Sequence, residues 1–90
     1  MPSSAMARRK RPLTEAHAMA PIIGANIRNE RVLRGLTQQE LAAKIGIHPA
    51  RISEAERGLH EPRVGRLQQI AAALNIPINQ LIMRQRRKNR

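Results

Sequence analysis

The sequence predicts an all-α domain of five short helices between two basic tails. No segment alternates apolar and polar residues as a half-buried strand does, apolar residues recur at intervals of three and four, and Gly or Pro separates the periodic stretches. Ninety residues allow one small domain at most. Because the chain contains no Phe, Tyr or Trp, its core must be aliphatic.

The first helix is expected at about residues 22–34. Pro21 precedes this segment and Gly35 follows it, as start and stop signals of a helix. Arg31 lies on the same helical stripe as the apolar residues. Those apolar residues are Ile23, Ile27 and Leu33. Residues 1–20 lack periodicity, and we expect them to form a disordered basic arm with at most a transient helix over 14–20.

The second helix follows a capping box. Thr37 and Glu40 have the spacing at which the hydroxyl accepts a backbone N–H and the carboxylate reaches back to the start of the helix. Gly46 ends the segment. The apolar stripe consists of Leu41, Ala42 and Ile45. A helix that begins after Thr37 and ends before Gly46 is therefore predicted.

The third helix is short and well bounded, at about residues 49–57. His48 precedes Pro49, which suits the first position of a helix because proline has no N–H to leave unpaired. Gly58 ends the helix. One face carries Ile52, Ala55 and Glu56.

Two further helices complete the prediction. The fourth is expected at about residues 64–74, with Asn75 as its C-terminal cap. Its apolar side consists of Leu67, Ile70, Ala71 and Leu74. A last short helix begins at Pro77 and turns Leu81 and Ile82 inward. Beyond it the apolar pattern stops.

Positive charge is concentrated at the two ends of the chain. Seventeen Lys and Arg against six Asp and Glu give a net charge of +11. This divides into +3 over residues 1–20, +3 over the predicted domain at 21–83, and +5 over the tail at 84–90. Basic arms around a mildly basic domain suit a polyanionic partner, although solvated tails of this kind often have no specific role. Both interpretations of the arms remain open.

Several classes of function are disfavoured. The chain has no Cys, and its three histidines are not paired, so neither a metal site nor any other cofactor is expected. Catalysis is not expected, because Ser53 has no histidine placed to activate it and no Gly-rich phosphate loop occurs. No apolar run approaches the length of a membrane span or a secretion signal, so we expect a soluble cytoplasmic protein. Without aromatic residues to stack on bases, a duplex or a protein is the expected partner.

Two glutamates of the third helix face opposite ways. Glu56 lies four residues after Ile52, on the inward side, whereas Glu54 lies on the outer side. An inward carboxylate needs a partner, and Arg31 on the stripe of the first helix can meet it with two hydrogen bonds. We therefore predict an ion pair between Arg31 and Glu56. The alternative is that both side chains are exposed.

From Ile22 to Ile82 the sequence resembles the helix-turn-helix domain of lambda-repressor and Cro-type regulators, the XRE family. The resemblance is carried by LRGLTQQELAAKIGIHPARISEAERG, then EP, then LQQIAAALNIPINQL. It implies a five-helix lambda-repressor-like fold in which Arg31 and Glu56 occupy the positions of the family's partly buried ion pair. It also implies a prokaryotic or phage-encoded, nucleoid-associated protein.

The resemblance implies that the third helix enters the major groove of double-stranded DNA while the second helix lies over the backbone. The residues expected at DNA are Gln38, Gln39, His48, Pro49, Ala50, Arg51, Ser53, Glu54, Arg57, Arg63 and Arg66. Among them Gln38 corresponds to a phosphate anchor. Glu54 could accept from cytosine N4; it could equally be a solvated residue bridged to Arg51 or Arg57.

The sequence departs from the family pattern in two ways. His48 stands where the family usually has a Ser or Thr cap, and is expected to cap less well. Pro49 and Ala50 have no polar side-chain atoms, so the amide-rich reading of bases that is usual in the family is absent. Specificity must then come from fewer side chains.

The function expected from these observations is that of a sequence-specific transcriptional regulator, a repressor that acts as a homodimer. Dimerisation is expected through the fifth helix and the loop before the fourth, with an apolar patch of Leu59, Ile78, Leu81, Ile82 and Met83. One alternative is an antitoxin that represses its own operon and binds a toxin protein. Another is a non-DNA interaction module with the same fold.

Overall fold

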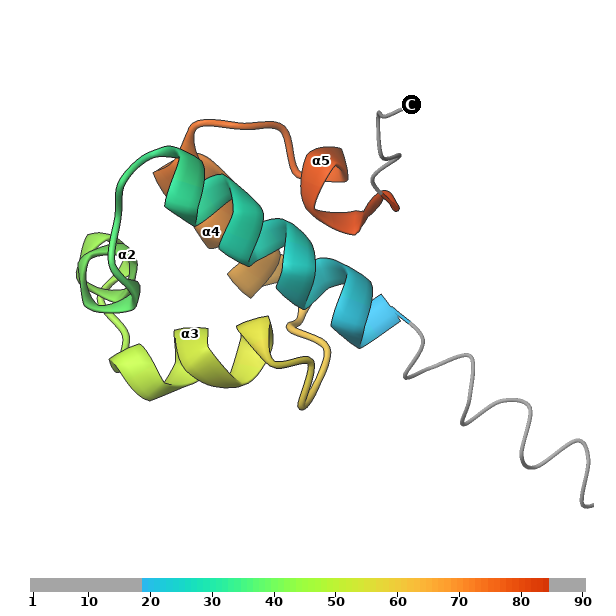
Figure 1. The fold of residues 1–90 in the computed structure, drawn as a ribbon, viewed down its shortest axis with the longest axis horizontal. Helices are drawn as coiled ribbons and strands as arrows, with labels where there is room; N and C mark the ends of the chain where they lie inside the picture. Colours follow the sequence, from blue (N-terminus) through green and yellow to red (C-terminus); the bar gives the residue numbers. More distant parts are fainter. Residues whose placement is uncertain (1–18, 85–90) are drawn as a thin grey trace, which may run out of the picture.

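Five helices joined by short turns make up residues 19–84, the part of the chain that the computed structural model describes (Figure 1). The first helix is described over residues 19–33. The others are α2 (Gln38–Ile45), α3 (Pro49–Glu56), α4 (Val64–Leu74) and α5 (Asn79–Ile82). No strand occurs in residues 19–84, so the all-α prediction is confirmed.

The first helix begins earlier than predicted. Residues 19 and 20 are already helical, and Ala20 is only 1% exposed, so the expected arm cannot extend to residue 20. Gly58 approaches the backbone of residues 20 and 21 closely, which places the loop after α3 against the start of the first helix. Neither feature has a signature in the local sequence. The remaining part of the expected N-terminal arm, and the C-terminal tail beyond residue 84, lie outside the described residues.

The predicted caps form as expected at α2. The Thr37 hydroxyl accepts from the N–H of Glu40 at 3.0 Å, and the Glu40 carboxylate accepts from the N–H of Thr37 at 2.8 Å. Gly46 ends α2 in the left-handed conformation, with φ of 73°. Asn75 ends α4 in the same way, with φ of 62°. By contrast α5 begins at Asn79, two residues later than predicted, and has four residues.

One aliphatic core holds the helices together. Its buried members come from all five helices and are Ile23, Ile27, Leu41, Ala42, Ile52, Ala55, Leu67, Ile70, Ala71, Leu74 and Leu81. Two residues predicted to face it do not: Leu33 is 78% and Ile82 37% exposed. Leu33 lies about 120° around the helix from Ile27, and the single turn of α5 can turn only one of two consecutive residues, Leu81, into the core.

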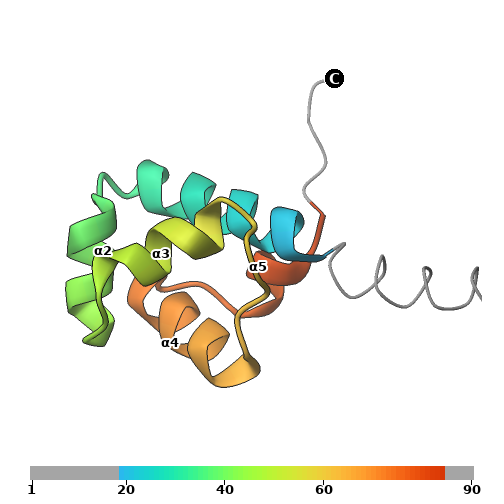
Figure 2. The same cartoon turned by 90° about the horizontal axis from the view of Figure 1, so that it is seen from below.

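The first helix and the end of α3 approach each other at backbone distance. A Cβ on Gly24 would clash with the carbonyl oxygens of Ala55 and Glu56, so the contact requires glycine. In Figure 2, α3 lies beside the first helix, and α4 lies below α3. This contact fixes the distance between the inner face of α3 and the first helix.

Asn26 ties the C-terminal end of the domain to the first helix. Its side chain is buried, and its amide nitrogen donates to the carbonyl oxygens of Leu81 and Met83, each at 2.8 Å. Carbonyl groups at the end of a helix otherwise lack partners within the helix. The sequence pattern did not single out Asn26, because its partners lie 55 and 57 residues away.

Candidate nucleic-acid interface

The helix-turn-helix consists of α2, the turn at Gly46 and α3, with α2 at the left and α3 along the lower edge in Figure 1. Ile52 and Ala55 face the core at 0% and 3% exposure. The outer side of α3 carries exposed and half-buried side chains. The exposed ones are Ala50, Arg51 and Arg57, and the half-buried ones are Pro49, Ser53 and Glu54. This side is thus accessible to a partner within the described part of the chain.

The expected ion pair is present on the inner side of α3. Nε of Arg31 lies 2.6 Å from Oε2 of Glu56, and Nη2 lies 3.0 Å from Oε1. A third N–H of Arg31 donates to the carbonyl oxygen of Leu36 at 2.7 Å. The side chains are 12% and 3% exposed, so the pair is largely shielded from water. The hydrogen bond to Glu56 raises the pKa of Arg31 above its ordinary value, against the opposing effect of burial.

Gln38 joins this pair. Its amide nitrogen donates to Oε1 of Glu56 at 2.9 Å, a contact that the sequence pattern did not predict. Glu56 therefore accepts hydrogen bonds from the first helix and from the start of α2. Arg31, Gln38 and Glu56, which we call the inner network, connect three helices. One N–H of the Gln38 amide remains for a further acceptor. Gln39, beside it, is exposed.

A second network lies on the outer side of α3. Nη1 of Arg51 donates to Oε1 of Glu54 at 2.9 Å, and Nε2 of His60 lies 3.5 Å from the same oxygen. We call these three residues the outer network. The Arg51 hydrogen bond is the main reason that the pKa of Glu54 is lowered. Of the two arginines that could bridge Glu54, the structure pairs it with Arg51; Arg57 instead donates from Nε to the Ser53 carbonyl at 3.4 Å.

His48 caps α3. Its Nδ1 accepts the N–H of Ala50 at 3.0 Å, so the histidine replaces the hydroxyl that is usual in the family. The cap that was expected to be poor thus still forms a hydrogen bond of ordinary length.

Arg63 and Arg66 line a hollow that α3 also lines. Arg63 is exposed and precedes α4 without a side-chain cap, and Arg66 is half-buried and donates from Nη1 to Oε1 of Gln69 at 2.9 Å. Both line the same hollow as Arg51 and His60. The fold therefore brings together four basic side chains from α3, the following loop and α4.

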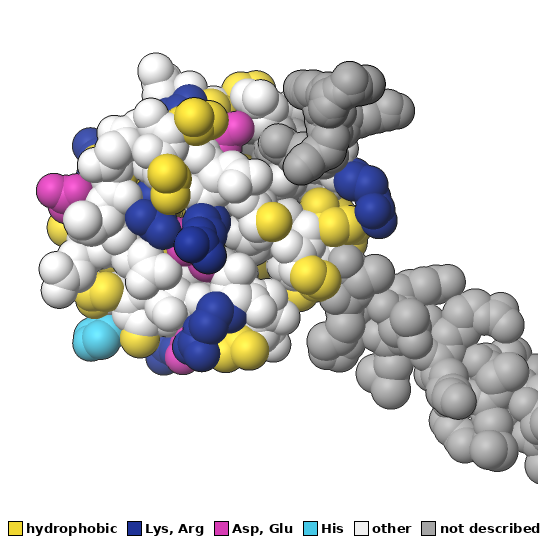
Figure 3. Space-filling view, in the orientation of Figure 1, with side chains coloured by type: hydrophobic (Ala, Val, Ile, Leu, Met, Phe, Trp, Pro, Cys, Tyr) yellow, Lys and Arg dark blue, Asp and Glu magenta, His cyan; other side chains and the backbone are white. Residues whose placement is uncertain are grey.

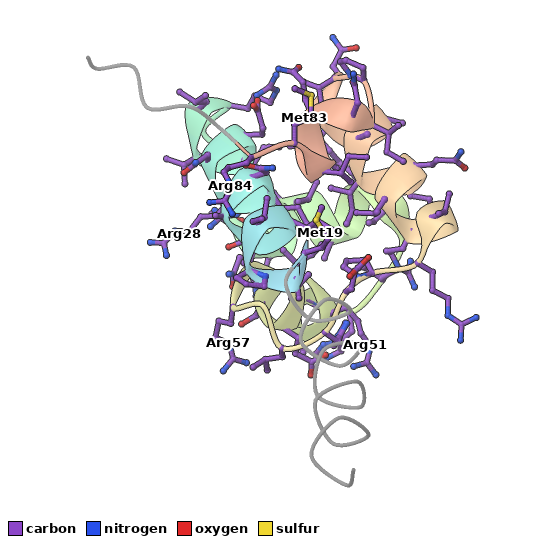
Figure 4. All side chains as sticks on the ribbon, turned by 90° about the vertical axis from the view of Figure 1, so that its right-hand side faces the viewer. Met19, Arg28, Arg51, Arg57, Met83 and Arg84 are labelled. Atoms are coloured by element: carbon purple, nitrogen blue, oxygen red, sulfur yellow. The ribbon has the colours of Figure 1, made fainter. Side chains whose placement is uncertain are left out.

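Arg28 is an exposed arginine of the first helix that was not among the residues expected at DNA. It follows Gly24 by four residues, so it lies one turn beyond the point where that helix touches α3. In Figure 3 Lys and Arg side chains gather over the first helix and α3. Figure 4 shows Arg28 and Arg57 on one side of the molecule and Arg51 on the other.

Membrane spans and metal sites are absent from the described part of the chain. No helix among residues 19–84 is long and apolar enough to cross a membrane. No group of three His, Asp or Glu side chains in the same range could hold a metal ion.

Known proteins resemble this chain over about two thirds of its length. YazB of Bacillus subtilis, described as an uncharacterized HTH-type transcriptional regulator, is 39% identical over 62 residues, which are 69% of this chain and 90% of YazB. The regulator y4dJ of Sinorhizobium fredii is 34% identical over 71% of this chain and 83% of its own. The chain spans only 41% of the length of two further rhizobial relatives, at 33% identity.

Solved structures share the fold. A hypothetical transcription factor from Neisseria has a TM-score of 0.71 and 29% identity, covering 73% of this chain and 76% of its own. The restriction-modification controller protein C.AhdI from Aeromonas hydrophila has a TM-score of 0.68 and 28% identity, covering 71% of this chain and 97% of its own. The Helix-turn-helix family model matches residues 27–81. The chain therefore belongs to the helix-turn-helix family, and the two relatives named above are described as HTH-type transcriptional regulators.

Proposed function

We propose that this protein binds double-stranded DNA sequence-specifically and regulates transcription, with α3 in the major groove. The proposal rests on the difference between the two faces of α3. Its inner face is held by Ile52, Ala55 and Glu56, while its outer face carries accessible side chains. A helix held rigidly from behind can present side chains to base edges without an added cost of ordering.

The proposed contacts divide by chemistry. Arg57, Ser53 and Glu54 face the bases, and Ala50 can touch a thymine methyl group. His48 and Pro49 lie at the N-terminal end of α3, which enters the major groove first. Backbone phosphates are contacted by Gln38, Gln39, Arg51, Arg63 and Arg66, with the free amides at the start of α2 adding to the attraction.

We further propose that the protein is a repressor that acts as a homodimer on an inverted repeat. Half-sites would lie about 34 Å apart, one turn of the duplex. Support comes from exposed apolar residues, Leu59, Ile82 and Met83. Leu81 must be removed from the patch expected from the sequence, because it is completely buried in the core. No observation on residues 19–84 favours the antitoxin or the non-DNA alternative.

Selection of bound sequences from a random duplex pool tests the proposal. We expect a defined motif that the protein binds about 10³-fold more tightly than random duplex at physiological salt. Arg57→Ala should weaken binding to that motif by roughly tenfold and relax its base preference. Lys44→Ala, which removes the same charge from the exposed end of α2, is the matched control and should have a smaller, sequence-independent effect. Recovery of no motif would reject the proposal.

A further inference from the structure

A hollow of about 670 Å³ lies between α3, the loop after it and the start of α4. Small-molecule sites in proteins have volumes of roughly 300–1,000 Å³, so the hollow is of suitable size. The inner network contributes no residue to it, and neither does Arg57. The hollow is therefore separate from the polar network that orients α3, although it shares the core residues Ile52 and Ala55 with the inner face of that helix.

The lining combines an apolar floor with a cationic rim. The floor is formed by the half-buried Ile47, with the buried core residues Ile52, Ala55 and Ile70 directly beneath it. The rim carries the three arginines Arg51, Arg63 and Arg66, together with His60, against a single carboxylate, Glu61. This charge balance favours an anion, and the floor favours one with an apolar body.

The arginines of the rim have N–H donors that no contact among residues 19–84 uses. Among residues 19–84 no carboxylate lies within salt-bridge distance of Arg63 or Arg66, and Arg66 uses one N–H on Gln69. A guanidinium has five N–H donors in a fork that matches a carboxylate. Arg51 is paired with Glu54, but the two side chains are 60% and 29% exposed. Ion pairs with this degree of solvent exposure are weak, and their members readily exchange one partner for another.

We propose that this hollow binds a small organic carboxylate with an apolar body, and that this ligand weakens DNA binding. The second part rests on the proposed function, since Arg51, Arg63 and Arg66 are the side chains proposed to hold phosphates. When a carboxylate is bound to these arginines, they can no longer contact the phosphates of the duplex. Because coupling between two ligands is reciprocal, DNA must weaken binding of the carboxylate by the same factor.

Direct titration of the full chain tests the site without DNA. Octanoate is the probe, and octanamide, of similar shape without charge, is its control; calorimetry measures both. We expect octanoate to bind at least about tenfold more tightly than octanamide, the equivalent of one charge-assisted hydrogen bond. Equal affinities, or no binding of octanoate, would overturn the proposal.

Two glutamines of α4 provide a matched pair of variants. Gln69 lines the hollow, while its exposed neighbour Gln68 does not. Gln69→Glu places a carboxylate beside Arg66 and should weaken octanoate binding by about tenfold or more. Gln68→Glu makes the same change of net charge and should leave the affinity within about twofold. Equal decreases of affinity in both variants would show a general charge effect and reject the site.

Binding of the selected duplex is then measured with and without saturating octanoate. An increase in the Kd for the duplex, retained in Gln68→Glu and reduced in Gln69→Glu, is the expected result. An unchanged Kd would overturn the coupling. If the protein binds no duplex at all, the proposed function fails, whereas the calorimetric result for the hollow stands independently.

Discussion

The two networks of α3 place glutamates that are two residues apart in opposite environments. Glu56 in the inner network accepts three hydrogen bonds from Arg31 and Gln38 and is 3% exposed. Glu54 in the outer network accepts from Arg51, lies near His60 and is 29% exposed. Both are carboxylates on the same helix, and both have an arginine partner.

The difference shows that burial, rather than the presence of a partner, decides what each carboxylate does. A shielded ion pair cannot exchange its partner for water, so removing one member leaves a buried charge unpaired. An exposed pair is screened and can be replaced by water or by another ligand at little cost. The inner network therefore orients α3, whereas the outer network is available for recognition.

Removal of the inner carboxylate should have the largest effect. Glu56→Ala leaves Arg31 without its partner in a shielded site and should lower the free energy of unfolding by about 3–5 kcal/mol, enough to unfold a marginally stable domain. Urea denaturation followed by circular dichroism measures it. Glu56→Gln keeps an acceptor and the shape, and should cost less. A fully stable Glu56→Ala variant would contradict the structural role of the inner network.

Two glycine substitutions test the close contact between the first helix and α3. Gly24→Ala puts a methyl group against the carbonyl oxygens of Ala55 and Glu56 and should cost about 1–3 kcal/mol of stability. Gly65→Ala in α4 meets nothing within 4 Å and should instead stabilise the domain by up to about 1 kcal/mol. Thermal denaturation of the two variants should shift in opposite directions. An unchanged or raised midpoint in Gly24→Ala would mean that the first helix and α3 can move apart without cost.

The outer carboxylate should matter for recognition and little for folding. Glu54→Ala should leave the urea midpoint at neutral pH nearly unchanged, while altering the motif selected from random duplexes. Because the pKa of Glu54 is lowered in the fold, its small contribution to stability is present above the unfolded pKa and disappears as pH falls through the folded one. Glu54→Ala should therefore flatten the acid side of the stability profile slightly. A large decrease of stability at neutral pH would reverse the two roles.

The smallest effect is expected from the C-terminal tail. Deletion of residues 85–90 removes four of the 17 basic residues, Arg86, Arg87, Lys88 and Arg90. If they bind phosphates, the slope of log affinity against log salt should become shallower by up to about 0.9 for each phosphate that is no longer neutralised, with the preferred motif unchanged. An identical slope would assign no role in DNA binding to the tail and leave α3 and its neighbours as the interface.

The sequence alone determined the features that depend on neighbours in the chain. The capping box of Thr37 and Glu40 and the stop at Gly46 could be predicted, because each acts within a few residues. Helical periodicity predicted that Glu54 and Glu56 lie on opposite sides of α3. It also predicted that Arg31 pairs with the inward Glu56.

Only the tertiary structure decided the contacts between distant segments. Asn26 binds carbonyl groups more than 50 residues away, Gln38 joins Glu56 across 18 residues, and the loop at Gly58 lies against the start of the first helix. The hollow likewise exists only because the fold brings Arg63 and Arg66 to the same surface as Arg51. Such contacts depend on the positions and angles at which the helices pack, and the periodicity of a single segment shows which face is buried but not which distant residues meet it.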